Sequence, residues 1–312
     1  MFTFMQCTGL AVGAVAGIAI TGAAAQADPA GQVAFVRSGS VYVLSGATEH
    51  RLTGDSDDTR PRWSPDGRRL AYGHAGKLWV MNADGTGKKA VATGPAGGAA
   101  WSPDGRFLAY AATGCTGIDG IFKVPAAGGT PQALFPASCR GKRPPTPVGR
   151  PKASGDLAAR LRVDSAVAWS PDGTRIAFRG GGCTGIFDDC LTVGTVATGA
   201  EQVVAGWGGG GQVFSGFAVV PDWRPDGQRL TWTAAQEGED SDTMQPVHVV
   251  EADIGTNTAR TVGVPLDREM AYDGPGQGVL TGQYGGASWL FRVDLASGAR
   301  TRLAQGSQPD IR

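Results

Sequence analysis

A short repeat, Trp-Xaa-Pro-Asp-Gly, is the feature of this sequence that most restricts its fold. Three copies have Ser at the second position and the fourth has Arg, and together they occupy residues 63–67, 101–105, 169–173 and 223–227. Each copy is followed by two β-type runs, in the first case 70–72 and 78–80. Pro presets the backbone for a tight turn, Asp suits the second central position, and Gly takes the left-handed conformation that follows. The repeat therefore predicts a four-stranded antiparallel sheet, too small to be stable alone, whose faces are buried against its neighbours.

Two further units match this pattern incompletely. Residues 33–35 and 41–43 correspond to strands of a unit without a first strand, and residues 279–281 and 290–292 correspond to another unit, with Tyr272 near the usual Trp place. The last six residues, 307–312, resemble a lone first strand that can complete the N-terminal unit. Six units of about 47 residues agree with the usual period of propeller blades. We predict an all-β, six-bladed β-propeller in which strands from both termini close one blade and remove the open sheet edges.

Composition supports this fold class and excludes others. The chain has 312 residues with 50 Gly and 19 Pro, which would interrupt almost every window of helical length. Lys and Arg number 28, and so do Asp and Glu, so the formal net charge is zero. Broad electrostatic capture of nucleic acid or of an anionic membrane needs a basic excess, so we expect neither as a partner.

The N-terminal segment has the features of an export signal. No charged residue precedes Asp28, residues 10–25 are apolar and small, and Ala25-Gln26-Ala27 offers a cleavage site. We expect a signal peptide over residues 1–27 and a propeller domain over residues 28–312, in a secreted or periplasmic protein. Residues 1–9 lack the usual Lys or Arg, so an uncleaved N-terminal anchor is the alternative.

The repeated segments resemble the TolB-type propeller repeat. The resemblance is carried by the four Trp-Xaa-Pro-Asp-Gly copies, by the Leu-Ala-Tyr and Leu-Trp-Val runs, and by Asn82-Ala83-Asp84-Gly85. It covers nearly all of residues 28–312 and implies a periplasmic or extracellular propeller that binds other proteins. The chain shows no separate α/β domain ahead of the propeller, which departs from TolB itself.

Strand order predicts which loops share a face of the disc. The turns between first and second strands and between third and fourth strands lie on one side. The remaining connections lie on the other side and include nearly every insertion, at residues 113–120, 139–164, 180–190, 206–221 and 235–246. Insertions gathered on one face are typical of a binding face, whereas neutral drift of exposed loops is the alternative.

The four cysteines of residues 28–312 lie in these insertions. Cys115 and Cys183 occupy equivalent places in adjacent blades, too far apart for a disulfide. We therefore predict the disulfides Cys115–Cys139 and Cys183–Cys190, which we expect to restrain the loops that contain them. Six residues separate Cys183 from Cys190, which is not a zinc spacing.

Three groups of residues are candidates for ligand or partner binding. Basic residues flank a Pro-rich stretch at 144–147, an acidic run lies in the insertion at 235–246, and an aromatic residue lies in a Gly-rich loop. Their members are Arg140 and Arg143; Glu237, Glu239 and Asp240; and Trp207. Solvated charge, and a Trp folded over its blade, are the competing interpretations.

Charged residues of the first strands are expected near the central channel. They include Arg62, Asp164 and Asp222, together with Arg60, Arg268, Asp310 and Arg312. Successive side chains of a strand point to opposite sides, so some of these residues should point into the channel. There they either bind a small ligand or pair with opposite charges on neighbouring strands. We favour pairing.

The sequence contains no recognisable catalytic motif, so we expect no catalytic residues, no metal ligands and no cofactor. Ca²⁺ at the acidic run is the alternative, although that run lacks a calcium-loop spacing. We predict a monomeric, non-enzymatic module that binds a protein partner in the envelope or outside the cell. The second hypothesis is a propeller hydrolase, lactonase-like or glycosidase-like, with a metal or carboxylate site at the channel mouth.

Overall fold

The computed structural model describes most of the chain from residue 31 onward. The described ranges are 31–54, 57–93, 97–115, 119–142, 155–187, 189–208, 215–237 and 245–312. The predicted signal peptide lies outside them. Within these ranges, no helix has the length and apolar character needed to cross a bilayer.

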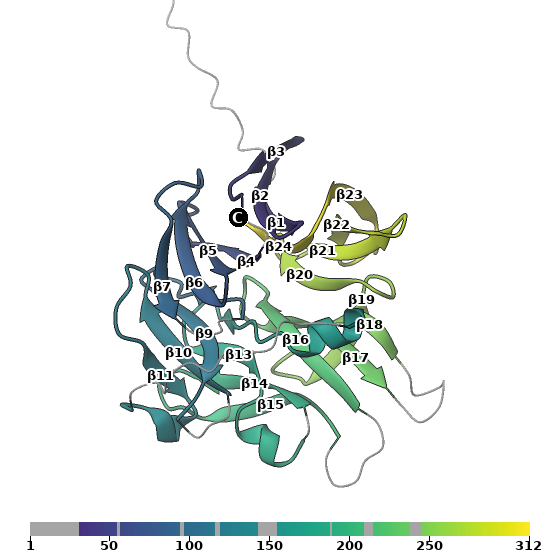
Figure 1. The fold of residues 1–312 in the computed structure, drawn as a ribbon. Helices are drawn as coiled ribbons and strands as arrows, with labels where there is room; N and C mark the ends of the chain where they lie inside the picture. The colour runs from purple at the N-terminus through teal and green to yellow at the C-terminus, as the bar shows by residue number, and fades with distance from the viewer. Residues whose placement is uncertain are drawn as a thin grey trace, which may run out of the picture.

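Six four-stranded antiparallel sheets form the blades of a propeller (Figure 1). Blade 1 contains β24 (Ser307–Ile311), β1 (Val33–Arg37), β2 (Ser40–Ser45) and β3 (Thr48–Arg51). Blade 2 contains β4 (Asp58–Trp63), β5 (Arg69–His74), β6 (Lys77–Asn82) and β7 (Lys89–Thr93). Blade 3 contains β8 (Ala100–Trp101), β9 (Phe107–Thr113), β10 (Asp119–Pro125) and β11 (Gln132–Phe135). In each blade the first strand in this order is the innermost.

The other three blades follow the same order along the chain. Blade 4 contains β12 (Ala168–Trp169), β13 (Arg175–Arg179), β14 (Asp189–Thr195) and β15 (Glu201–Trp207). Blade 5 contains β16 (Ser215–Trp223), β17 (Arg229–Glu237), β18 (Gln245–Asp253) and β19 (Thr258–Val262). Blade 6 contains β20 (Arg268–Tyr272), β21 (Gln277–Tyr284), β22 (Ala287–Asp294) and β23 (Arg300–Gln305). The strands of blade 5 extend into residues 206–221 and 235–246, which were predicted to be insertions.

The ring closes through β24, as predicted. This strand pairs antiparallel with β1, with Val33 opposite Ile311 and Ala34 opposite Asp310. The C-terminal strand therefore supplies the inner strand that the N-terminal unit lacks.

The repeated turns are built by the same hydrogen bonds in three blades. In blade 2, Ser64 Oγ donates to Asp66 Oδ1 at 2.5 Å and accepts from Arg69 N at 2.9 Å. Gly67 adopts a φ of 64° and donates its N–H to Ser64 O. Residues 102–107 and 170–175 repeat the two side-chain bonds. In the fourth copy Arg224 replaces Ser, and its Nη2 pairs with Asp226 Oδ2 at 2.6 Å.

A second set of turns lies directly beside the first. Ala83 N, which follows the third strand of blade 2, donates to Arg68 O in the first turn at 2.9 Å. Blades 3 to 6 contain the equivalent bond, from Ala126, Val196, Ile254 and Leu295. One face of the disc is therefore made of short, paired turns, and we call it the short-turn face. The opposite side, the insertion face, contains the long connections.

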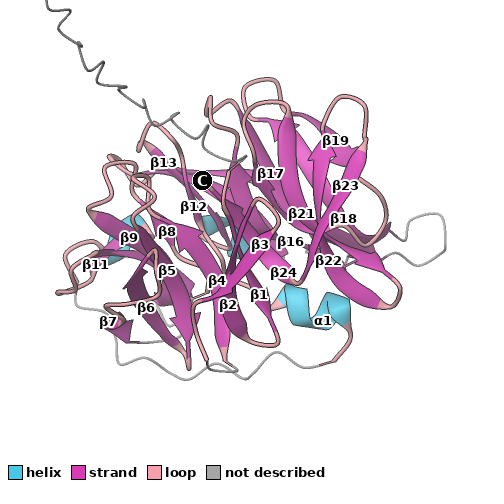
Figure 2. Cartoon of the chain, turned by 90° about the horizontal axis from the view of Figure 1, so that it is seen from above, coloured by secondary structure: helices cyan, strands magenta, loops and turns pink. Residues whose placement is uncertain are grey.

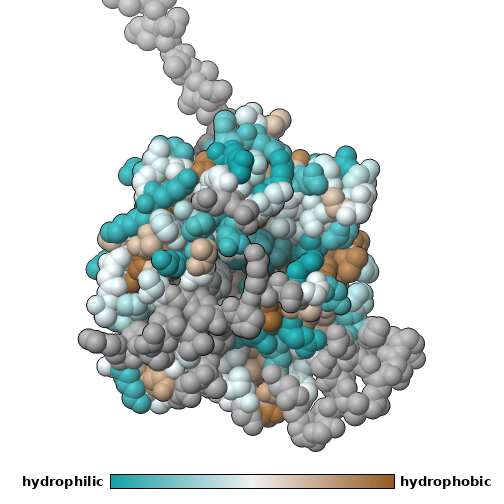
Figure 3. Space-filling model, in the orientation of Figure 1, coloured by the Kyte–Doolittle hydropathy of each residue, from teal (hydrophilic) through white to brown (hydrophobic). Residues whose placement is uncertain are grey.

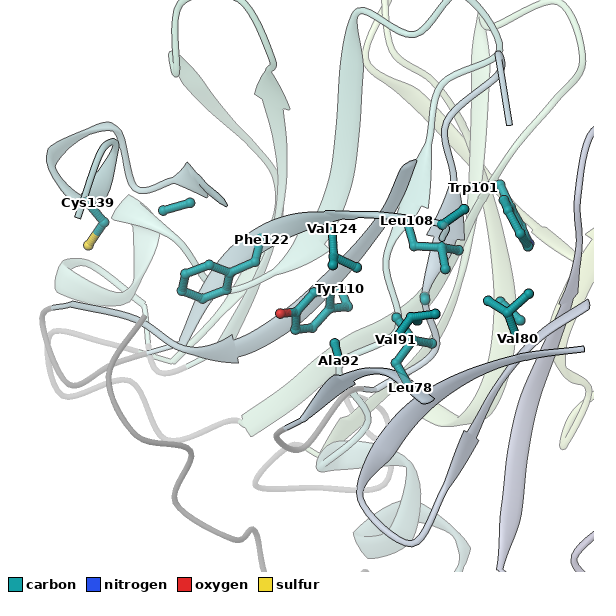
Figure 4. Close-up of a cluster of buried hydrophobic side chains, with 14 residues drawn as sticks. Leu78, Val80, Val91, Ala92, Trp101, Leu108, Tyr110, Phe122, Val124 and Cys139 are labelled. Atoms are coloured by element: carbon teal, nitrogen blue, oxygen red, sulfur yellow. The ribbon is translucent and has the colours of Figure 1, made fainter. Parts of the chain in front are cut away.

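The hydrophobic core is divided into clusters between successive blades. Figure 4 shows the cluster between blades 2 and 3, which contains Leu78 and Val91 of blade 2 and Trp101, Leu108 and Phe122 of blade 3. Two of the repeat Trp residues also join blades by hydrogen bonds: Trp101 Nε1 donates to Arg62 O and Trp223 Nε1 to Ala168 O, each in the preceding blade. Each blade therefore buries its apolar faces against both neighbours, as the repeat predicts.

Three short helical segments lie in the connections: η1 (Ala137–Cys139), α1 (Leu157–Arg162) and η2 (Gly182–Gly185). Helix α1 begins at Asp156, whose carboxylate accepts from Ala159 N at 2.8 Å. Its Leu161 packs with Phe217 and Val247 of blade 5. Figure 2 shows α1 on the side of the disc opposite most of the short turns.

Candidate functional site

The position immediately before the repeat Trp, which is replaced by Tyr272 in blade 6 and by Ile311 in blade 1, lines the channel. It is Arg62 in blade 2, Asp222 in blade 5 and Asp310 in blade 1, and it is Ala in blades 3, 4 and 6. Blades 2 and 5 lie opposite each other, yet the charge of Arg62 acts on Asp222. These two side chains are therefore close enough for their charges to interact.

Two of these carboxylates also join adjacent blades. Asp310 Oδ2 accepts from Trp63 N at 2.6 Å, and Asp222 Oδ2 accepts from Tyr272 N at 3.0 Å. Arg62 Nη1 lies 3.6 Å from Asp310 Oδ1. Burial raises the pKa of Asp222 to about 7, against the effect of Arg62 and with a further contribution from Asp310. Burial likewise raises the pKa of Asp310.

A second layer of the channel is centred on the buried Arg60. Its Nη2 lies 2.6 Å from Asp164 Oδ2 and 2.8 Å from Glu269 Oε1. Glu269 Oε2 accepts from the Thr281 hydroxyl and from Gln308 N, and Gln308 Oε1 accepts from Arg60 N. This network connects blades 1, 2 and 6 with the segment that precedes blade 4.

The charges of this network favour the ionised forms of Arg60 and Glu269. Burial alone lowers the pKa of Arg60, but Asp164 and Glu269 outweigh it, so the pKa lies above its usual value. Burial raises the pKa of Glu269, and Arg60 and Arg268 outweigh it, so that pKa lies below its usual value. Opposite charges at these distances favour the charged form of each partner.

Three of the residues predicted on first strands near the channel are placed differently. Asp164 is not part of a first strand but lies between α1 and β12. Arg312 lies in the seam between blades, where its guanidinium is 4.5 Å from the Trp63 ring centroid and Nη1 donates to Gly67 O. Arg268 is buried and donates to Leu266 O and Ser288 Oγ within blade 6.

Sequence reasoning missed Glu269 and Gln308. Both lie three residues before the aromatic position of their repeat, as Arg60 does, and all three have a positive φ between 50° and 60°. The inner strands of blades 2 and 6 also shift register at these residues. Aligning the units on this offset is the signal that would have found them, because a bulged position aims its side chain differently from its neighbours.

Both predicted cysteine pairs are present. Cys115 and Cys139 have a Cα–Cα distance of 5.6 Å, and Cys183 and Cys190 have one of 6.3 Å. Each pair joins segments of a single blade and its adjoining connection.

Arg140 lies between blades 3 and 4 rather than on a free loop. Its guanidinium donates to Leu134 O, Val196 O and Ala197 O at 2.6–3.0 Å. Arg143 lies outside the described residues.

Trp207 is the last residue of β15, not part of a loop. It pairs with Asp189, and its ring lies against Gly216 of blade 5, where an added Cβ would be 2.4 Å from Trp207 Cδ1. Trp207 therefore packs between blades 4 and 5. In the acidic run, Glu237 ends β17, and Glu239 and Asp240 lie outside the described residues. Figure 3 shows that hydrophilic and hydrophobic side chains are mixed on the face that carries α1.

Comparison with known proteins gives similarity of fold. The sequence matches no protein-family model and no curated protein. The structure of TolB from Acinetobacter baumannii is similar with a TM-score of 0.66 and 15% identity, covering 91% of this chain and 67% of that one. The putative TolB from Agrobacterium tumefaciens gives 0.60 and 18%, covering 89% and 91%. The β-propeller domain of the Trilobed protease from Pyrococcus furiosus gives 0.47 and 14%, covering 86% and 75%.

The described strands and these comparisons lead to one conclusion about architecture. The chain is a six-bladed β-propeller, closed by its terminal strands, that shares its fold with TolB proteins.

Proposed function

We propose that this protein is an exported, non-enzymatic propeller that binds another protein in the cell envelope or outside the cell. The observation that carries the proposal is the asymmetry of the disc. The short-turn face is made of turns bonded to one another, whereas the insertion face contains α1 and the long connections. A rigid scaffold that displays variable connections on one face is the usual design of a binding surface.

Two further features support this proposal. Two disulfides brace connections of the insertion face, and disulfides persist in oxidising compartments outside the cytoplasm. In the channel, both Asp164 and Glu269 are already paired with the guanidinium of Arg60. A metal or substrate bound there would have to compete with these ion pairs.

The test is a set of pull-downs from envelope extract with purified wild type and three variants. In two variants, residues 143–154 or 238–244 are replaced by Gly-Ser linkers of equal length, and in the third the short-turn face is altered by Lys88→Glu. We expect a partner that is recovered with wild type and with Lys88→Glu and is lost with at least one linker variant. Equal recovery with all four proteins would contradict an insertion-face site.

A second candidate function is hydrolysis at the channel. Asp222 favours it, because a carboxyl with a pKa of about 7 that faces Arg62 and Asp310 has the properties of a general acid. Turnover of an aryl ester, an aryl glycoside or a lactone by wild type, and its loss in Asp222→Asn, would support this function over the first.

A further inference from the structure

A basic groove lies at the outer rim between blades 3 and 4. Its volume is ≈ 570 Å³, and the residues that matter for its chemistry are Lys123, Pro131, Leu134, Arg140, Lys142 and Val196. Pro131 belongs to the β10–β11 connection and Val196 follows β14, so the groove opens beside two turns of the short-turn face. Arg140 and Lys142 belong to the connection that follows β11, so the groove lies at the rim between the short-turn face and the insertion face.

Arg140 is held in a fixed orientation at this groove. Its Nε donates to Leu134 O in blade 3, and its Nη1 and Nη2 donate to Ala197 O and Val196 O in blade 4. A guanidinium has five N–H groups, so two remain for a ligand. Among the described residues, Arg140 forms no ion pair with a carboxylate. Its charge is therefore fixed in place and is not neutralised by any carboxylate of the described residues.

The Cys115–Cys139 disulfide determines where the two cations of this segment lie. Cys139 ends η1 and immediately precedes Arg140. Arg140 N donates to Ala137 O and Lys142 N donates to Cys139 O, so a tight turn continues from the disulfide. The disulfide fixes this turn to the β9–β10 connection, which contains Cys115. It therefore places Arg140 and Lys142 at the rim of the groove.

The charges that line the groove are all positive. Lys123 projects from β10, with Nζ 4.9 Å from the Phe107 ring centroid, and the side chain of Lys142 is exposed. The described lining contains no Asp or Glu. Three cations without a counter-ion attract an anionic partner and reject a cationic one.

The groove also has apolar and backbone features that a simple anion would not use. Leu134 and Val196 line it, and both pack with the core between blades 3 and 4. β11 is the outermost strand of blade 3, so its outer edge borders the groove. Such an edge offers main-chain hydrogen bonds to an extended segment.

We propose that this groove binds an extended acidic segment of a protein partner, with carboxylates at the three cations and an apolar side chain against Leu134 and Val196. The inference rests on the proposed binding function because it assumes a protein partner, but it places the contact in the rim groove and not on residues 143–154 or 238–244.

The test is fluorescence anisotropy with a labelled six-residue peptide of alternating Glu and Leu, at 50 and 300 mM salt. We expect saturable binding to wild type that weakens at the higher salt concentration. The double variant Lys123→Glu/Lys142→Glu should bind at least tenfold more weakly. Lys77→Glu/Lys88→Glu, which alters two exposed lysines of blade 2, is the matched control and should bind as wild type does.

A second pair of variants tests the role of the disulfide. Cys115→Ala/Cys139→Ala should weaken peptide binding, whereas Cys183→Ala/Cys190→Ala should leave it unchanged. Circular dichroism checks that each variant is folded, and the lysine variants decide the question if a cysteine variant is not.

Three results would overturn the inference. They are equal binding by the charge-reversed and control variants, equal affinity for a peptide of alternating Lys and Leu, and full competition by citrate at the concentration of the peptide. The last would indicate a small-anion site. The linker variants described above should retain the acidic peptide, so failure of the groove and failure of the insertion face give different results.

Discussion

Asp222 and Arg60 both lie in the channel, but burial has different consequences for their charge. Arg60 has two carboxylate partners within 2.8 Å and stays charged, whereas Asp222 has an N–H donor and the more distant Arg62. An ionic partner at short range compensates for lost hydration, and one at longer range compensates only in part. The channel therefore contains one firmly ionised network and one carboxyl that can titrate near neutral pH.

The first prediction concerns Asp222→Asn. The pKa of Asp222 is about 7 in the folded protein and about 3.9 in an unfolded chain, so between these values the folded state binds a proton that the unfolded state lacks. Its stabilising effect is complete below pH 4 and is lost as the pH rises to 7. Relative to wild type, Asp222→Asn should therefore gain roughly 1–3 kcal/mol of unfolding free energy from pH 4 to pH 8, measured by urea titration.

Asp172→Asn is a control of opposite sign. Hydrogen bonds from Ser170 and from Thr174 N lower the pKa of Asp172, so its stabilising effect is present at neutral pH and is lost as the solution is acidified. The free energy of unfolding of this variant should be lower than that of wild type at pH 7, and the two values should converge at low pH. If the unfolding free energies of Asp222→Asn and wild type changed in parallel between pH 4 and pH 8, the first prediction would be contradicted.

The residue scale is where the sequence was least informative. It identified Arg62, Asp164 and Asp222 as channel candidates, and these residues lie where opposite charges meet. It did not predict Glu269 or Gln308, because their orientation depends on a bulge at a left-handed position that neither Glu nor Gln favours. Arg312 was misplaced because alternation alone does not distinguish the channel from the seam beside Trp63.

The repeated turn is an element that the sequence predicted well. Ser, Pro, Asp and Gly each have a local role there, so no long-range information was needed. The lengths of the blade 5 strands were harder to predict. β16 contains Gly216 and Pro221, and β17 ends in Ala235-Gln236-Glu237, so composition favours loops although both segments pair with neighbouring strands.

The second prediction compares two turn glycines. Gly173 has a φ of 74°, so Gly173→Ala should cost roughly 1 kcal/mol of unfolding free energy, because a Cβ disfavours this conformation. Gly276 lies in the corresponding turn of blade 6 without a positive φ, and an added Cβ there meets no atom within 4 Å. Gly276→Ala should stay within about 0.5 kcal/mol of wild type in the same denaturant titration. Equal losses for both variants would contradict the role assigned to the left-handed turn.

At the scale of the whole molecule, β24 connects three blades. It pairs with β1, its Asp310 accepts from Trp63 N of blade 2, and its Gln308 N donates to Glu269 of blade 6. The sequence predicted this closure because residues 307–312 resemble a first strand and the N-terminal unit lacks one. It could not predict the side-chain links, which depend on how the inner strands meet.

The third prediction is that deletion of residues 307–312 destabilises the entire ring. Loss of the strand exposes the β1 edge and leaves Arg60 without Gln308, so the midpoint of thermal unfolding should fall by about 10 °C or more. Arg312→Ala removes only the side-chain contacts with Trp63, Gly67 and Gln32 and should cause a smaller decrease. A synthetic peptide of residues 305–312 should restore stability to the truncated protein. An unchanged unfolding midpoint after deletion would show that closure contributes little.

The pairing of β1 with β24 also determines the order in which the molecule can mature. Arg312 and Gln32 form a hydrogen bond across 280 positions of the sequence. A ribosome or a translocation pore that delivers the chain from its first residue presents β1 long before its partner strand emerges. Until then β1 has a free edge, and a late-arriving β24 from another copy competes for it, which makes strand exchange between molecules the expected error of crowded synthesis.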